Sequence, residues 1–147
     1  MSKFDSDNVA HRPFSDALER LRGIGLRPTR QRLALARLLL EGGDRHVTAE
    51  TLHAEAVAAG IRVSLATVYN NLHQFTTADL LREVVVAPGV TYFDTNVTDH
   101  HHLYYEDEGS MVDLEGDGVV LNKLPPMPAG TQVKRVDVVI RVKKVSK

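Results

Sequence analysis

Between residues 29 and 93 the sequence repeats a pattern of helix starts and stops that strongly limits the fold. Thr29, Thr48 and Ser64 each precede a segment with apolar residues at helical spacing, and hydroxyl side chains are favoured directly before a helix. Glycines follow the first two segments, as is common where helices end. The pattern therefore predicts three short helices: residues 30–40, a segment from Thr48 to Gly60, and residues 65–75.

Two further patterns flank these helices. Residues 15–22 read as an earlier helix that Ser15 caps and glycines end. Residues 81–87 and 90–93 are β-like and are joined by Pro-Gly, the pair expected at the centre of a type II turn. A short link between the last two helices suits a helix-turn-helix. Helices followed by a hairpin predict a winged helix-turn-helix domain.

The outer face of the helix at residues 65–75 is unusual for a surface helix. Solvated helix faces usually carry Lys and Glu, whereas this face carries small, neutral, hydrogen-bonding groups that suit the edges of DNA bases. At about 100° per residue it gathers Ala66, Thr67, Asn70, Asn71 and Gln74. This face is predicted to enter the major groove.

The charge distribution is uneven, although the net charge of the chain is only −1. Six arginines occur between residues 20 and 37 without a single acid: Arg20, Arg22, Arg27, Arg30, Arg32 and Arg37. An ordinary solvated helix face and a local patch for DNA phosphates both explain this run.

The second half of the chain is strand-rich. Residues 103–106, 111–114 and 132–144 read as strands, and residues 119–124 as a brief helix before a run of prolines. So small a sheet buries little apolar surface alone. We expect it to pair with a second copy of the chain.

Three consecutive histidines lie where the helix-rich half gives way to the strand-rich half. In an extended segment His100 and His102 point to one face and His101 to the other. The first pair could share a divalent metal with a carboxylate such as Asp94, which leaves His101 for a different ligand, for example a haem iron. The plain alternative is a solvated polar turn.

Composition sets further limits. The chain has no cysteine, so thiolate zinc sites are excluded and any metal must be held by His, Asp and Glu. No apolar run approaches the length that spans a bilayer, and the first residues lack the apolar core of a signal peptide. A cytoplasmic protein without a membrane partner is expected.

Several motifs together resemble the ferric uptake regulator family, and within it the haem-responsive iron response regulator branch. They are Gly25-Leu-Arg-Pro-Thr-Arg-Gln-Arg32, His46-Val-Thr-Ala-Glu50, Ser64-Leu-Ala-Thr-Val-Tyr-Asn-Asn-Leu72, Tyr92-Phe-Asp-Thr-Asn96, Asp99-His-His-His102 and Arg135-Val-Asp-Val-Val-Ile-Arg141. The resemblance runs nearly end to end. It implies an α/β (α+β) protein with a winged-helix DNA-binding domain at residues 1–93, a hinge at 94–102 and a small dimerisation domain at 103–147.

The resemblance also implies functional residues. The regulatory metal ligands would be His46, Asp94, His100 and His102, for Mn, Fe or Zn, and the haem-responsive cluster would be His100, His101 and His102. Thr67, Tyr69 and Arg27 match positions at which the family contacts DNA, whereas Asn70 stands where many relatives have an arginine. Together with the helix face and the basic segment before it, the predicted DNA contacts are Arg27, Thr29, Arg30, Ala66, Thr67, Tyr69, Asn70 and Asn71. Tyr105 and Glu108 stand where many relatives have their first cysteine pair, so no structural zinc is expected.

The leading function is a homodimeric transcriptional regulator, repressor or activator, of iron and haem genes that binds an AT-rich operator. Haem would lower its DNA affinity, and a haem-synthesis enzyme could deliver the haem. Two alternatives stay open: a regulator that senses manganese or zinc rather than haem, and a metal-dependent hydrolase. The second lacks any HExxH, nucleophile elbow or phosphate-binding glycine loop, so no enzyme is expected. A protein-interaction module would leave the arginine run without a purpose.

Overall fold

The computed structural model describes residues 13–146, which form two compact units that meet in sequence between Val97 and Thr98. Each unit contains its own three-stranded sheet. Within the described residues no helix is long and apolar enough to cross a membrane.

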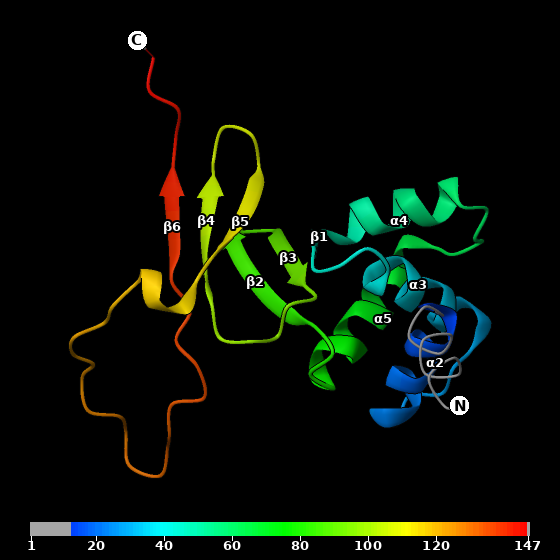
Figure 1. Cartoon of the computed structure of the whole chain (residues 1–147), viewed down its shortest axis with the longest axis horizontal. Coiled ribbons are helices and arrows are strands. Elements are labelled where there is room, and N and C mark those ends of the chain that lie inside the picture. Colours follow the sequence, from blue (N-terminus) through cyan, green and yellow to red (C-terminus); the bar gives the residue numbers. More distant parts are fainter. Residues whose placement is uncertain (1–12, 147) are drawn as a thin grey trace, which may run out of the picture. The chain divides into compact units, whose positions relative to one another are not determined.

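Among its described residues, the first unit contains four helices (Figure 1). They are α2 (Pro13–Gly23), α3 (Arg30–Leu40), α4 (Ala49–Ala58) and α5 (Leu65–Thr77). Thr29, Thr48 and Ser64 cap the last three, and each hydroxyl accepts a hydrogen bond from the backbone N–H three residues later. The three helix starts predicted from these caps are confirmed.

Two helix predictions are wrong in detail. Ser15 lies inside α2, which begins at Pro13; proline suits the first helical position because its missing N–H has no partner there. The α5 helix continues to Thr77 rather than ending at Phe75, and the hydroxyls of Thr76 and Thr77 donate to carbonyls one turn earlier.

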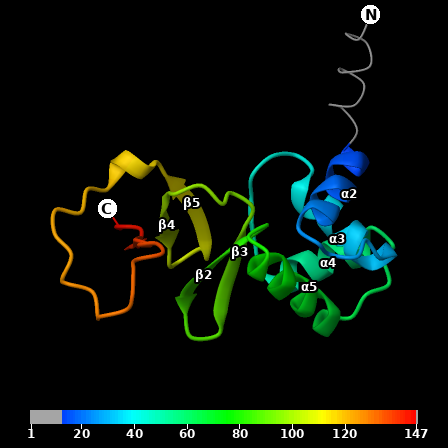
Figure 2. The same ribbon diagram turned by 90° about the horizontal axis from the view of Figure 1, so that it is seen from below.

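A hairpin follows α5 as predicted. Strands β2 (Arg82–Ala87) and β3 (Val90–Asp94) pair antiparallel, and Gly89 in the connecting turn has a φ of 77° that glycine adopts without strain (Figure 2). A third strand, β1 (His46–Val47), pairs with β3. Sequence periodicity missed β1 because two residues show no alternation.

The core of the first unit joins the helices to the sheet. Leu21 from α2, Leu39 from α3, Leu52 from α4, Leu72 from α5 and Phe93 from β3 are among its fully or nearly fully buried side chains. One face of α5 therefore packs against the core, and its opposite face is exposed.

We expect Leu72→Ala to destabilise the first unit by about 2–5 kcal/mol, because a fully buried leucine is removed and a cavity remains. Leu65→Ala on the same helix is the matched control, since Leu65 is 36% exposed. Urea unfolding of both variants measures the difference. Equal losses of unfolding free energy would contradict this assignment of the core.

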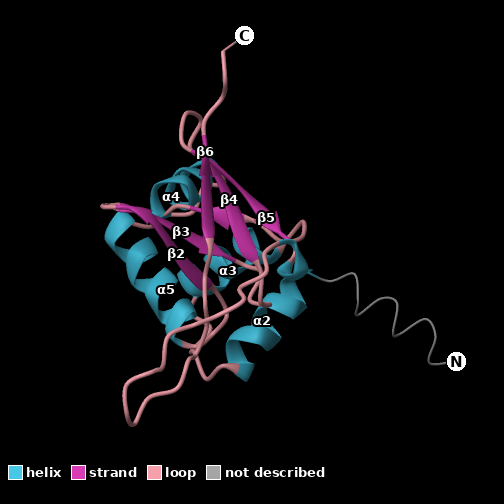
Figure 3. Cartoon of the chain, turned by 90° about the vertical axis from the view of Figure 1, so that its left-hand side faces the viewer, coloured by secondary structure: helices cyan, strands magenta, loops and turns pink. Residues whose placement is uncertain are grey.

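The second unit is a sheet of order β5-β4-β6 (Figure 3), with β4 (His101–Tyr105), β5 (Ser110–Leu114) and β6 (Val139–Val142). Strands β4 and β5 form the predicted antiparallel pair, and β6 lies parallel to β4. The predicted final strand at 132–144 is too long, because β6 pairs only along the short β4.

The brief helix predicted at residues 119–124 is also wrong. A 3₁₀ turn occupies Gly116–Gly118 instead, and residues 119–124 have no regular structure. Pro125 explains this in part, because a proline disfavours helical backbone at the preceding residue and leaves few residues for a helix.

Candidate DNA interface and metal ligands

The exposed face of α5 carries most of the groups that the sequence predicted. Ala66, Asn70 and Gln74 are exposed, and Thr67 and Tyr69 are partly exposed. The helix begins at the cap Ser64, and Val68, Leu72 and Phe75 turn the opposite face into the core. The first unit therefore presents a neutral helix face of the kind that reads base edges.

Asn71 does not belong to this face, since only 6% of its surface is exposed. Its Oδ1 accepts a hydrogen bond of 3.0 Å from Arg32 Nε, and its Nδ2 donates to the carbonyl of Thr67 at 2.9 Å. With both polar atoms engaged inside the unit, Asn71 holds α3 against α5. We therefore remove it from the proposed set of base contacts.

Arg32 is the other partner in that link, and the sequence patterns predicted no specific role for it. It also donates to the carbonyl of Arg27 at 2.9 Å and to Gln74 Oε1 at 2.5 Å. One guanidinium thus fixes the segment before α3 to the exposed face of α5. Such a rigid fork is a property of arginine that lysine lacks.

The other basic residues of this region remain at the surface. Arg27 and Arg30 are exposed, and Thr29 between them caps α3. Arg30 and Arg62 contribute to the lining of a shallow pocket of about 410 Å³ in which Gln31 donates to the carbonyl of Arg62. These cations can meet phosphates without losing an internal ion pair.

Tyr69 makes a specific contact with the first turn of α4. Its hydroxyl donates to Glu50 Oε1 at 2.7 Å. This hydrogen bond lowers the pKa of Glu50 and raises the pKa of Tyr69, because it stabilises the carboxylate and the protonated phenol. Both groups lie at the surface, so the carboxylate is the charged acceptor at neutral pH.

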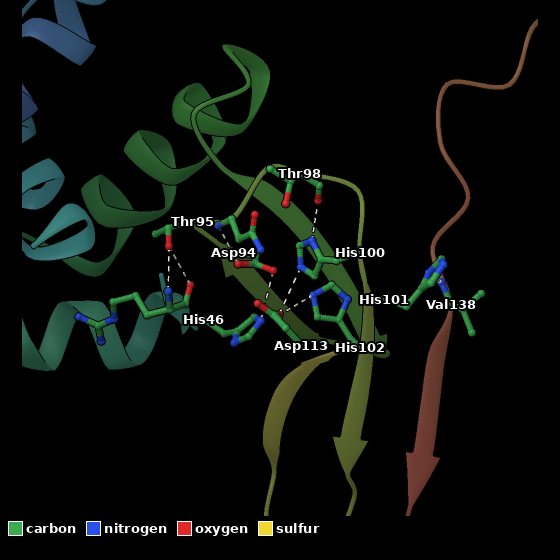
Figure 4. Close-up of polar contacts among 11 residues, drawn as sticks. His46, Asp94, Thr95, Thr98, His100, His101, His102, Asp113 and Val138 are labelled. Carbon is green, nitrogen blue, oxygen red and sulfur yellow. Dashed lines mark hydrogen bonds and ion pairs between the residues drawn. The ribbon is translucent and has the colours of Figure 1, made fainter. Parts of the chain in front are cut away.

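A first group of candidate metal ligands lies in the sheet of the first unit. His46 and Asp94 are directly opposite each other on β1 and β3, and His46 Nε2 is 3.2 Å from Asp94 Oδ2 (Figure 4). Asp94 Oδ1 accepts from the N–H of Asn96 at 2.9 Å. The backbone N–H of Arg45 donates to Thr95 Oγ1 at 2.8 Å, which further holds the two chain segments together.

A second group lies in the second unit. Nε2 atoms of His100 and His102 are 3.3 and 3.5 Å from the same atom, Asp113 Oδ1 (Figure 4). Nδ1 of His100 is 2.5 Å from the carbonyl of Thr98. Because a carbonyl only accepts, this Nδ1 carries the hydrogen, and in the neutral ring Nε2 has the lone pair.

The tautomer of His100 bears on whether its Nε2 and Asp113 could bind a metal ion. A neutral His100 would place a lone pair against a carboxylate oxygen, and two acceptors at 3.3 Å are stabilised only by a proton or a cation near them. A histidine whose other nitrogen donates to a carbonyl is also the usual form of a metal ligand. The donor set therefore fits a divalent cation.

His101 faces the other way, as the alternation along an extended segment predicted. Its Nδ1 accepts a hydrogen bond of 3.1 Å from the backbone N–H of Val138 (Figure 4). In a neutral His101, Nε2 therefore carries the hydrogen. Iron could bind Nε2 only if the hydrogen moved to Nδ1, which would then no longer accept from Val138.

Sequence reasoning missed Asp113 as a candidate ligand. It lies directly opposite His102 on β5. The signal was present in the hairpin that the sequence did predict: once Tyr105 pairs with Ser110, the register brings Asp113 beside the histidines. The candidate ligands of the described residues are thus His46, Asp94, His100, His102 and Asp113, distributed over both units.

Comparison with known proteins gives the class of this chain. Residues 23–140 match the model of the ferric uptake regulator family. The peroxide operon regulator of Bacillus subtilis strain 168 is 32% identical over 111 residues, which cover 76% of each chain.

Solved structures agree with this match. The ferric uptake regulator from Pseudomonas aeruginosa with manganese has 25% sequence identity and a TM-score of 0.65 over 87% of this chain and 97% of its own. The Vibrio cholerae ferric uptake regulator has the same TM-score at 22% identity, over 86% and 98% of the two chains. The chain therefore belongs to the ferric uptake regulator family. It is a metal-responsive transcription regulator of that family and not an enzyme.

Proposed function

We propose that this protein is a homodimeric regulator whose affinity for an AT-rich, palindromic operator depends on a divalent cation held by histidines and carboxylates of both units. One observation carries the proposal. The candidate ligand His46 lies in β1, and the chain continues from β1 through the cap Thr48 directly into the helix-turn-helix formed by α4 and α5. The sensor and the reader therefore share one short segment.

On the DNA side, α5 would lie in the major groove with Ala66, Thr67, Tyr69 and Asn70 toward the bases. The exposed Arg27 and Arg30, with Thr29 between them, would meet the backbone or the adjacent minor groove. A second copy of the chain would double this surface about a two-fold axis, which suits a palindrome with half-sites about one helical turn or a multiple of it apart.

On the metal side, we propose that one cation takes ligands from His46 and Asp94 of the first unit and from His100, His102 and Asp113 of the second. Imidazole and carboxylate donors suit manganese, ferrous iron and zinc, and availability selects among them. When bound, the cation supplies positive charge that holds donors of both groups together. Its occupancy would then fix the orientation of the reader relative to the sheet that joins the copies.

Support for the dimer comes from the second unit. Its three-stranded sheet leaves β5 and β6 as outer strands. The segment between them exposes Val120, Leu121 and Leu124. A second copy that covers these apolar side chains would enlarge a core that is small for an independent sheet.

Haem is a narrower proposal that rests on the resemblance to the iron response regulator branch. His101 accepts a hydrogen bond from Val138, so binding of haem iron to His100 or His102 is simpler than binding to His101. Haem bound to His100 or His102 would remove a ligand from the cation. DNA affinity would then fall. The alternative of a manganese or zinc sensor needs no haem. Because relatives are named for their peroxide response, peroxide added to the iron-loaded protein is a further condition for the DNA titration below.

The test is a DNA titration of the purified protein against a duplex selected from a randomised pool in the presence of Mn(II). Fluorescence anisotropy is measured with Mn(II), Fe(II) or Zn(II), with chelator, and with haem added last. These conditions distinguish a haem-responsive regulator from a manganese or zinc sensor. The proposal expects tight binding only with a divalent cation. Binding that is equally tight with chelator, or no DNA binding in any condition, would contradict it.

A further inference from the structure

A hydrogen bond between Tyr69 and Glu50 joins two helices at the surface of the first unit. Tyr69 lies at the edge of the exposed face of α5 and packs partly against the core, and its hydroxyl is directed to the first turn of α4. A surface tyrosine has water available as a partner, so a 2.7 Å bond to one carboxylate selects one orientation among several.

A negative charge at this place is unexpected on a DNA-binding surface. Phosphates repel a carboxylate, and the neighbouring α5 face contains no acid. Glu50 is nevertheless stable here, because carboxylates are favoured in the first turn of a helix and Glu50 is the acid in the first turn of α4. Besides this favourable position in α4, the carboxylate has one observed partner, the hydroxyl of Tyr69.

The surroundings show what the bond arranges. Tyr69 and Glu50 line a pocket of about 450 Å³ together with Gly89, Val90 and Thr91, which lie at the turn of the hairpin. The imidazole of His73, one turn later on α5, stacks on the Tyr69 ring with centroids 6.2 Å apart and an angle of 20° between planes. The ring is thus held at its tip by Glu50 and on one side by His73, next to the hairpin.

We propose that Glu50 is a positioning residue that sets how Tyr69 reads DNA. This inference rests on the proposed function, in which Tyr69 meets the bases. With its proton donated to Glu50, the hydroxyl presents only acceptor lone pairs, and the ring presents its free surface. Tyr69 therefore contributes an acceptor and an apolar edge to recognition, and its proton is not available to a base acceptor.

The proposal makes a prediction that charge alone does not. Removing a carboxylate from a DNA-binding surface should tighten binding to all DNA through weaker repulsion. If Glu50 positions Tyr69, Glu50→Ala should instead lower the ratio of operator affinity to random-DNA affinity by about tenfold, the scale of one hydrogen bond to a charged group. Glu50→Gln retains an acceptor oxygen and should keep most of that ratio.

A double-mutant cycle tests the link to Tyr69 directly. Tyr69→Phe keeps the ring and removes the hydroxyl, so it should lower the ratio about as much as Glu50→Ala, and the double variant should be no worse than either. Asp79→Asn is the charge control, since Asp79 is an exposed acid of the same unit with a φ of 62° that asparagine also tolerates. It should leave the ratio unchanged.

The measurement uses the full chain with Mn(II) and the selected duplex at one salt concentration. Additive losses in the cycle, or a Glu50→Ala variant that only binds all DNA more tightly, would overturn the positioning role while leaving the proposed function intact. Failure of the parent protein to bind DNA would instead be a failure of the proposed function.

A second readout needs no DNA. Ultraviolet titration of the free protein should show a transition of Tyr69 above the usual pKa of a tyrosine, and Glu50→Ala should lower that pKa, because the hydrogen bond to Glu50 raises it. Tyr69→Phe should remove the same transition. A titration that Glu50→Ala leaves unchanged would overturn the inference whatever the DNA result.

Discussion

Replacing His102 with alanine is expected to abolish the metal-dependent part of DNA binding. His102 would supply one imidazole nitrogen, and Asp113, which faces it, would lose a partner. Substituting even a residue that only supports a metal ligand weakens metal affinity by about 10–100-fold, so loss of a ligand should exceed that range. At a fixed Mn(II) concentration that saturates the parent, the variant should bind the selected duplex no better than it does with chelator.

The matched control is His101→Ala, one residue away in the same strand. His101 faces Val138 rather than Asp113, so this variant should keep its Mn(II)-dependent DNA binding. Thermal unfolding of both variants without metal checks that the sheet still forms. Equal loss of the Mn(II) response in the two variants would contradict the assignment of opposite faces.

Ala66→Glu should lower operator affinity nearly as much as His102→Ala, because it repels DNA rather than because it alters a metal ligand. Ala66 is exposed near the start of α5, where the proposed complex brings it close to bases and phosphates. Placing like charges against each other costs several kcal/mol, so Ala66→Glu should weaken operator binding about 100-fold or more. Mn(II) binding in the absence of DNA should stay at the level of the parent.

Ala54→Glu is the corresponding control, because Ala54 is an exposed alanine within α4. It adds the same charge to the same unit, and anisotropy with the selected duplex compares the two variants. Should Ala66→Glu and Ala54→Glu weaken DNA binding equally, α5 would not be the helix that enters the groove.

Much of the first unit followed from local sequence rules. Thr29, Thr48 and Ser64 each predicted a helix start because a hydroxyl cap acts within one turn and needs no tertiary information. The Pro-Gly turn of the wing is equally local, since Gly89 adopts the positive φ that the turn requires.

The missed features depend on contacts between distant residues. Strand β1 is visible only through its partner β3, and the loss of Asn71 from the exposed face follows from its hydrogen bond to Arg32 on another helix. The contact of Tyr69 with Glu50 likewise joins two helices. A helical projection treats each helix alone and cannot include such pairs.

The candidate metal ligands were predictable only in part. Alternation along an extended segment correctly separated His101 from its two neighbours. Asp94 was a candidate from the residues themselves, whereas the role of His46 came only from the family resemblance; the two residues are directly opposite each other on β1 and β3. Asp113 was missed because its place depends on the register of the β4–β5 hairpin.

Counting tightly bound Mn(II) tests most directly whether one cation uses ligands from both units. Equilibrium dialysis would compare the parent chain with His46→Ala, which alters only the group in the first unit, and His102→Ala, which alters only the group in the second. A single shared cation predicts one tightly bound Mn(II) per parent chain and none in either variant. Variants that each retain a tightly bound Mn(II) would show separate sites and contradict the account.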